Sequence, residues 1–152
     1  MTTPRPASIN AANPAASSGA AGCEILIVDD NAPLRRVMAA ALRSGGYSVC
    51  EAGDGRDALE RLRQHRFRLL VTDIFMPDVD GFELIMHLRG VQPPPAILAM
   101  SGDGFADTEV FLQAARHFGV KQTLLKPFSL DELAGAVRQL IGDPAIAPPQ
   151  GT

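Results

Sequence analysis

Five side chains able to take part in chemistry follow short apolar runs of the sequence. The four runs are of strand length, and they lead to Asp29 and Asp30, to Asp73, to Ser101 and to Lys126. If the runs are parallel strands, their carboxyl ends meet at one edge of the sheet, which is where open α/β sheets bind ligands. The sequence therefore predicts a site that holds three carboxylates, a hydroxyl and an ammonium.

This combination of groups favours magnesium-dependent phosphoryl transfer. Three carboxylates at one edge repel one another and need a proton or a cation, and their hard oxygens suit Mg²⁺. A carboxylate beside Mg²⁺ can attack phosphorus and form an aspartyl phosphate. The Lys126 ammonium could hold one phosphoryl oxygen as a point charge, Ser101 could donate a hydrogen bond to another, and Gly102 would leave room for the group to enter.

The apolar runs alternate with segments of helical periodicity. Strands are expected at 24–28, 47–51, 69–73, 96–100 and 122–125, and helices near 33–44, 56–65, 82–90, 110–118 and 130–141. Five strand–helix units in alternation predict an α/β fold with a doubly wound parallel sheet and right-handed crossovers.

Two helix starts carry capping signals. Asn31 suits the N-cap of the first helix, and Ser129 with Glu132 forms a capping box for the last. Apolar residues of the first helix recur at helical spacing and predict its buried face. They are Leu34, Val37, Met38, Ala41 and Leu42.

Composition and charge narrow the class of protein. The 152 residues are 46% hydrophobic and 20% charged, with a formal net charge of −3, which is typical of a globular domain and offers no basic surface to nucleic acid. No apolar stretch reaches the roughly 20 residues of a membrane helix, and no signal peptide is evident, so we expect a cytoplasmic protein with no membrane partner. We expect a disordered tail at 1–22, a folded domain at 23–142 and a flexible tail at 143–152.

Cys23 and Cys50 are the two cysteines of the chain. They fall at the start of the first expected strand and late in the second. This offset would exceed the ~7 Å Cα separation that a disulfide permits. We therefore expect two free thiols that pack as small apolar groups.

Four motifs give the chain a resemblance to a known family. They are Ile-Leu-Ile-Val-Asp29-Asp30; Val-Thr-Asp73-Ile-Phe-Met-Pro77 with Asp80-Gly81; Ala-Met-Ser101-Gly102; and Leu-Leu-Lys126-Pro127-Phe128. Each motif alone is a weak signal, but all four in this order and spacing are a strong one. From Glu24 to about Ile141, the chain resembles the receiver domain of two-component response regulators. The resemblance implies a (βα)5 flavodoxin-like fold with strand order 2-1-3-4-5.

The resemblance also implies a role for each group of the expected site. Asp73 is the phosphoacceptor, and Mg²⁺ is held by Asp29, Asp30, Asp73 and the main-chain carbonyl of Phe75. The phosphoryl group is bound by Ser101, which acts as the switch hydroxyl, by Gly102 and by Lys126. The peptide bond between Lys126 and Pro127 is cis.

Partners follow from the same resemblance. The donor is a phosphohistidine on a sensor histidine kinase or a phosphotransfer protein, and the target is an unknown downstream protein. No output domain follows the fifth helix, so signalling is expected to pass through protein contacts without direct binding to nucleic acid. Such a domain is not an enzyme in the usual sense, because it catalyses only its own phosphorylation and dephosphorylation. We expect a monomer or a phosphorylation-dependent homodimer.

Two positions depart from the pattern of the family. Thr123 stands three residues before Lys126, where receivers usually carry a Tyr or Phe that swings inward when the switch hydroxyl follows the phosphate. Threonine is too small to do this, which puts the readout in question but not the phosphorylation. Phe75 lies two residues after Asp73, and we hypothesise that its side chain alters the lifetime of the acyl phosphate by screening water.

Two other functions stay open. A magnesium-dependent phosphohydrolase of the haloacid-dehalogenase type would also use Asp73 as its nucleophile. It would need a second aspartate where this chain has Phe75, and a cap domain for which the chain has no room. A phosphate-independent pseudo-receiver that only binds partners is disfavoured by the intact Asp73, Ser101 and Lys126, but Thr123 keeps it open.

Overall fold

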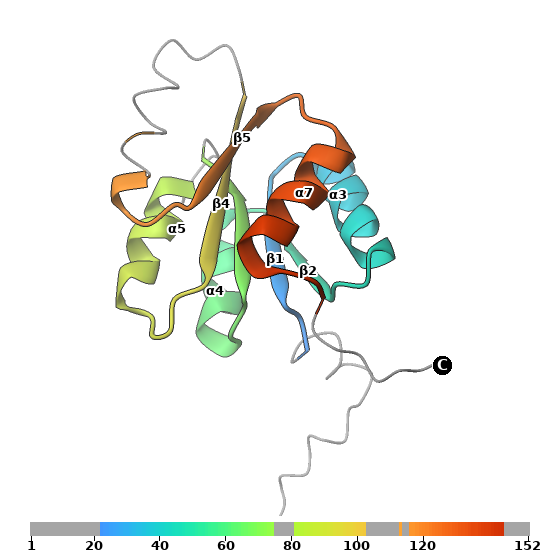
Figure 1. Cartoon of the computed structure of the whole chain (residues 1–152). Coiled ribbons are helices and arrows are strands. Elements are labelled where there is room, and N and C mark those ends of the chain that lie inside the picture. Colours follow the sequence, from blue (N-terminus) through green and yellow to red (C-terminus); the bar gives the residue numbers. More distant parts are fainter. Residues whose placement is uncertain (1–21, 75–80, 103–112, 114–115, 145–152) are drawn as a thin grey trace, which may run out of the picture.

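A five-stranded parallel sheet forms the centre of the structure, a computed structural model that describes residues 22–74, 81–102, 113 and 116–144 (Figure 1). The strands are β1 (Ile25–Val28), β2 (Val49–Ala52), β3 (Leu69–Asp73), β4 (Ala96–Gly102) and β5 (Gln122–Lys126). They pair in parallel in the order β2-β1-β3-β4-β5. The doubly wound sheet and the flavodoxin-like strand order are therefore confirmed.

Helices cover both faces of the sheet (Figure 1). One layer contains α3 (Ala32–Ser44) and α7 (Leu130–Ile141), and the other contains α4 (Gly55–Gln64), α5 (Gly81–His87) and the short 3-10 helix η1 (Leu88–Gly90). Alternate residues of β1 serve the two layers, because successive side chains of a strand point to opposite faces. Ile25 and Ile27 pack with α3 and α7, whereas Leu26 and Val28 pack with α4 and α5.

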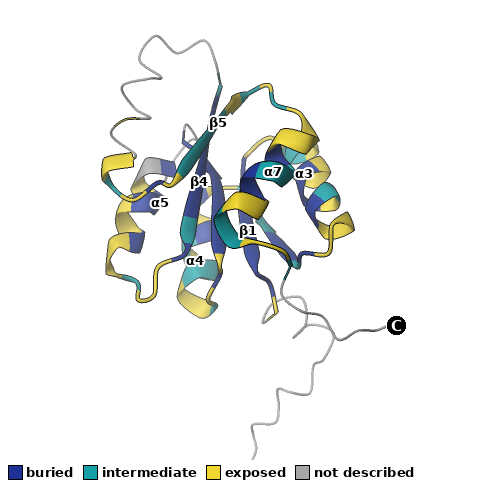
Figure 2. Ribbon diagram, viewed as in Figure 1, coloured by how far each residue is buried: buried dark blue, intermediate teal, exposed yellow. Residues whose placement is uncertain are grey.

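The central strands β1 and β3 are buried along their whole length. Figure 2 shows the dark blue strands between helices whose outer faces are yellow. Such continuous apolar runs are stable in a sheet only when both of its faces are covered. Burial on both faces holds β1 and β3 in place, and with them the aspartates at their carboxyl ends.

Both expected caps are present. Asn31 Oδ1 accepts a 3.1 Å hydrogen bond from the Leu34 amide at the start of α3. At the start of α7, Ser129 Oγ accepts from the Glu132 amide at 3.0 Å, and Glu132 Oε1 accepts from the Ser129 amide at 2.8 Å. The chain therefore enters each helix at a fixed point just after a strand that ends at the site.

The expected buried face of the first helix is wrong at one position. Val37 is 49% exposed, and the buried residues of α3 are Met38, Ala39 and Leu42. Successive residues of an α-helix are about 100° apart. With Met38 facing the sheet, Val37 and Ala39 therefore lie on opposite sides of the buried face of α3. The sheet takes the smaller Ala39, and Val37 faces outward.

The expectation of two free thiols is also wrong. Cys23 and Cys50 form a disulfide, with their Cα atoms 5.9 Å apart. Strand β1 begins only at Ile25, so Cys23 precedes the paired ladder and its position does not follow the strand register. The Glu24 and Ile25 amides both donate to the Ser48 carbonyl, at 2.9 and 3.1 Å, which turns the entering chain toward β2.

Some expectations fall outside the described residues. These are most of the two tails at 1–22 and 143–152, most of the fourth helix at 110–118, and Phe75. Within the fourth segment, Gln113, Arg116 and His117 are helical, and Gly119 follows them at a φ of +109°, as expected for a helix-ending glycine. Among the helices of the described residues, none combines the length and apolar character needed to cross a bilayer.

Candidate phosphoryl-transfer site

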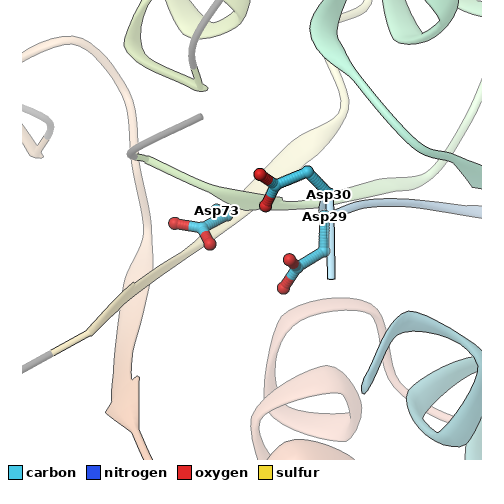
Figure 3. A group of neighbouring side chains, drawn as sticks. All are labelled: Asp29, Asp30 and Asp73. Atoms are coloured by element: carbon cyan, nitrogen blue, oxygen red, sulfur yellow. The ribbon is translucent and has the colours of Figure 1, made fainter. Parts of the chain in front are cut away.

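Three aspartates gather at the carboxyl edge of the sheet. Val28 of β1 is in register with Thr72 of β3, so Asp29 and Asp73 lie side by side where the two strands end. Each of Asp29, Asp30 and Asp73 offers a carboxylate oxygen, and these atoms lie within 4.8 Å of one another. Figure 3 shows the three side chains grouped at the ends of the neighbouring strands. The expected acidic cluster is thus assembled.

Lys126 joins two of these aspartates. Its Nζ donates a 2.8 Å hydrogen bond to Asp29 Oδ2 and another of 2.8 Å to Asp73 Oδ2. Burial of Lys126 lowers its pKa, but the hydrogen bonds and charges of Asp29 and Asp73 outweigh burial, so the pKa of Lys126 lies above its ordinary 10.5. The lysine is therefore a firmly charged counter-ion within the site.

The two aspartates of β1 have different surroundings. Asp29 is fully buried, and its second oxygen, Oδ1, accepts a 2.9 Å hydrogen bond from the Asn31 amide. Asp30 is exposed. Asp73 is nearly buried at 7% exposure, so the cluster opens to solvent mainly on the side of Asp30.

Ser101 and Gly102 end the strand beside Asp73. Asp73 is in register with Met100 of β4, and Gly102 with Lys126 of β5. Ser101 is fully buried, and its hydroxyl donates a 3.3 Å hydrogen bond to the Gly102 carbonyl. Among the residues that the structure describes, none lies within 4 Å of a Cβ added at Gly102, so this part of the chain leaves space beside the glycine.

Of the two positions that depart from the family pattern, Thr123 lies within the described residues and Phe75 does not. Thr123 is partly buried on β5, where its Oγ1 accepts a 3.5 Å hydrogen bond from Arg116. The Lys126–Pro127 peptide bond is cis, as the family resemblance implies.

Two residues near the site have roles that the sequence analysis missed. Arg35 Nη1 donates a 2.9 Å hydrogen bond to the main-chain carbonyl of Asp29. A Cβ added at Gly81 would lie 2.0 Å from the carbonyl oxygen of Asp73, so only glycine fits there without a shift of backbone. The signals in the sequence were an arginine at the start of the helix that follows the first strand, and a glycine directly after Asp80.

The donor set suits a divalent cation with a preference for oxygen ligands. Three carboxylates and one ammonium leave a formal charge of −2 among these four side chains. Carboxylate oxygens are the ligands by which proteins hold Mg²⁺, which keeps several of its waters. The residues present therefore fit Mg²⁺ through Asp29, Asp30 and Asp73.

Comparison with known proteins points to the family that the four sequence motifs resemble. The chain matches the family described as response regulator receiver domain over residues 25–138. The response regulator receiver protein CpdR of Brucella abortus is 33% identical over 117 residues, which cover 77% of this chain and 95% of that protein. A crystal structure of a signal receiver domain from Bermanella marisrubri has a TM-score of 0.70 and 31% identity, and covers 77% of this chain and 96% of that one.

Other relatives are longer than this chain. A probable transcriptional regulator, ycf27 of Porphyridium aerugineum, is 31% identical over 118 residues, but the chain spans only 48% of its length. The family match at residues 25–138 contains all five strands and the three aspartates at their carboxyl edge. The chain belongs to the response regulator receiver domain family.

Proposed function

We propose that this chain accepts a phosphoryl group on Asp73 from a phosphohistidine, with Mg²⁺ held by Asp29, Asp30, Asp73 and the Phe75 carbonyl. The observation that carries the proposal is the paired contact of Lys126 with Asp29 and Asp73 inside a cluster of three carboxylates. A lone aspartate at a strand end needs no such counter-ion. An aspartate that must carry a dianionic phosphoryl group does.

The transfer is a single displacement at phosphorus. A carboxylate oxygen of Asp73 forms the new P–O bond, and the P–N bond to the donor imidazole breaks, with its electron pair remaining on the imidazole nitrogen. Bound Mg²⁺ supplies positive charge for the phosphoryl oxygens. Lys126 supplies a second positive charge, and its flexible side chain can keep the ammonium in contact with a phosphoryl oxygen.

Ser101 is the proposed switch hydroxyl. Its present hydrogen bond to the Gly102 carbonyl is 3.3 Å long, which is weak for a hydroxyl donor. The hydroxyl can therefore be redirected to a phosphoryl oxygen at low cost, and none of the described residues fills the space beside Gly102 where the group would enter. Phosphorylation would then favour whichever backbone arrangement lets Ser101 make that bond.

Readout in this chain takes place without the usual aromatic. Thr123 Oγ1 accepts a long, 3.5 Å hydrogen bond from Arg116 at the edge strand, and we propose that this pair responds to the movement of Ser101 instead. The donor is a histidine kinase or phosphotransfer protein, and the target is a downstream protein in the cytoplasm. One relative is described as a probable transcriptional regulator, so the absence of nucleic-acid contacts stays a prediction from the net charge of −3.

The test is a mass measurement of the intact chain after incubation with acetyl phosphate and Mg²⁺. We expect one added phosphoryl group in the wild type and in Asp57→Asn, an exposed carboxylate on α4 used as control, and none in Asp73→Asn or in EDTA. If no adduct appears, binding of beryllofluoride distinguishes rapid hydrolysis from a site without this chemistry. Absence of both adduct and beryllofluoride binding would favour the phosphate-independent pseudo-receiver.

A further inference from the structure

We propose that Arg35 is a positioning residue that sets the direction of the Asp29–Asp30 pair for metal binding. The inference rests on the proposed function of the site. The Arg35 side chain lies beside the proposed metal ligands and bonds to the main chain between Asp29 and Asp30.

The guanidinium of Arg35 fixes one peptide plane. Its Nη1 donates a 2.9 Å hydrogen bond to the carbonyl oxygen of Asp29. That carbonyl belongs to the peptide group joining Asp29 to Asp30, so its direction also sets the Cα of Asp30. Figure 3 shows the two side chains leaving adjacent positions of this segment. Because Asp30 is exposed, packing alone does not hold it toward the cluster.

Glu51 of β2 holds the guanidinium in place. Arg35 Nε lies 3.1 Å from Glu51 Oε1, and the two side chains are only 15% and 23% exposed. A Cβ added at Gly53 would lie 3.1 Å from Arg35 Nη1, so the glycine leaves the space that the guanidinium occupies. The planar guanidinium can bond a carboxylate and a carbonyl at once, which a single ammonium cannot do with the same geometry.

The ion pair with Glu51 also reduces the repulsion between Arg35 and a cation. An unpaired arginine beside a cation site would weaken cation binding by repulsion. Glu51 offsets part of that charge, which it shares with Arg43, so the repulsion that Arg35 exerts on a bound cation is reduced.

Arg43 provides a matched control on the same helix. Its Nη1 lies 3.5 Å from the other oxygen of Glu51, and its Nη2 donates a 2.7 Å hydrogen bond to the Val49 carbonyl. Arg43 therefore ties α3 to β2 in the same way as Arg35 but touches no residue of the acidic cluster. If Arg35 had a purely structural role, replacing either arginine would lower stability without a specific loss of Mg²⁺ affinity in the Arg35 variant.

The experiment measures Mg²⁺ affinity of the full chain by calorimetry, with thermal unfolding in EDTA recorded beside it. Residues that orient metal ligands typically cost about 10–100-fold in metal affinity when they are lost. We expect Arg35→Met to raise the Kd for Mg²⁺ at least about tenfold and Arg43→Met to leave it within about twofold, although both lower the melting temperature. Arg35→Lys, which keeps the charge and serves if Arg35→Met does not fold, is expected to weaken binding to an intermediate degree.

Each outcome bears on the inference. Wild-type affinity in Arg35→Met, or an equal loss in Arg43→Met, would overturn the positioning role while the proposed function stands. A wild-type chain that binds no Mg²⁺ would overturn both the positioning role and the metal of the proposed function.

Discussion

The ammonium of Lys126 donates a 2.8 Å hydrogen bond to the carboxylate of Asp73, the proposed phosphoacceptor. The same nitrogen donates to Asp29 at 2.8 Å. One positive charge thus serves two buried carboxylates, and it does so in the region where a cation would bind. The lysine therefore stabilises the fold and at the same time opposes the entry of Mg²⁺.

Replacement of Lys126 should separate these two effects. Lys126→Met leaves two buried carboxylates without their shared partner, so we expect a loss of roughly 2 kcal/mol or more in the free energy of unfolding in EDTA. The same change removes a positive charge from the cation site, so we expect the Kd for Mg²⁺ to fall about tenfold. Urea unfolding and calorimetry measure the two quantities.

Lys121→Met is the control for that experiment. Lys121 is the other lysine of the chain and is exposed, so it should change neither quantity appreciably. Weaker Mg²⁺ binding in Lys126→Met would show that the lysine holds the aspartates in a binding geometry instead of opposing the cation.

The pH dependence of stability follows from the raised pKa of Lys126. A group whose pKa is higher in the folded than in the unfolded chain contributes stability below the unfolded value, and this contribution is lost as the pH rises through the folded value. The difference in unfolding free energy between wild type and Lys126→Met should therefore be flat from about pH 7 to about pH 10 and decrease at higher pH. Urea unfolding across this range checks the sign; a difference that shrinks between pH 7 and 9 would contradict it.

The sequence predicted the site best where a chemically active residue directly ends a strand. Asp29, Asp73 and Lys126 each end an apolar run, and a parallel sheet with short crossovers brings those ends together whatever the details of packing. The role of Arg35 was missed because its partner at the site is a backbone carbonyl, and the sequence does not show which side chain will reach a given carbonyl. The disulfide escaped because Cys23 lies before β1, where strand register does not apply.

Gly81 should be intolerant of any side chain. A Cβ at this position would lie 2.0 Å from the Asp73 carbonyl oxygen and 2.8 Å from the Ile74 Cα, so the backbone that carries Asp73, the proposed phosphoacceptor, must move. We expect Gly81→Ala to destabilise the chain by about 2–4 kcal/mol and to slow phosphorylation by acetyl phosphate.

Gly135→Ala is the matched comparison, measured by urea unfolding beside Gly81→Ala. Gly135 lies within α7, and a Cβ there would meet none of the described residues within 4 Å. Alanine should therefore stabilise the helix by about 0.5–1 kcal/mol. A neutral Gly81→Ala would mean that the chain beside Asp73 can shift without cost.

The disulfide between Cys23 and Cys50 should make stability depend on reductant. It closes a loop across a sequence separation of 27, for which the chain-entropy estimate is about 3–4 kcal/mol. We expect dithiothreitol to lower the unfolding free energy by this order, and to have no effect on the double variant Cys23→Ser/Cys50→Ser. Alkylation in denaturant, followed by intact mass, should show no adduct before reduction and two afterwards.

The same alkylation, performed on an acid-quenched lysate, also bears on the expected location of the protein. Disulfides are rare in the reducing cytoplasm, so a chain that is oxidised in cells would argue against that location. A chain that is reduced in cells but oxidised after purification would be consistent with a cytoplasmic location, and the disulfide would then have formed on exposure to air. Two adducts without any reduction of the purified chain would contradict the disulfide and restore the free thiols that the strand register alone predicts.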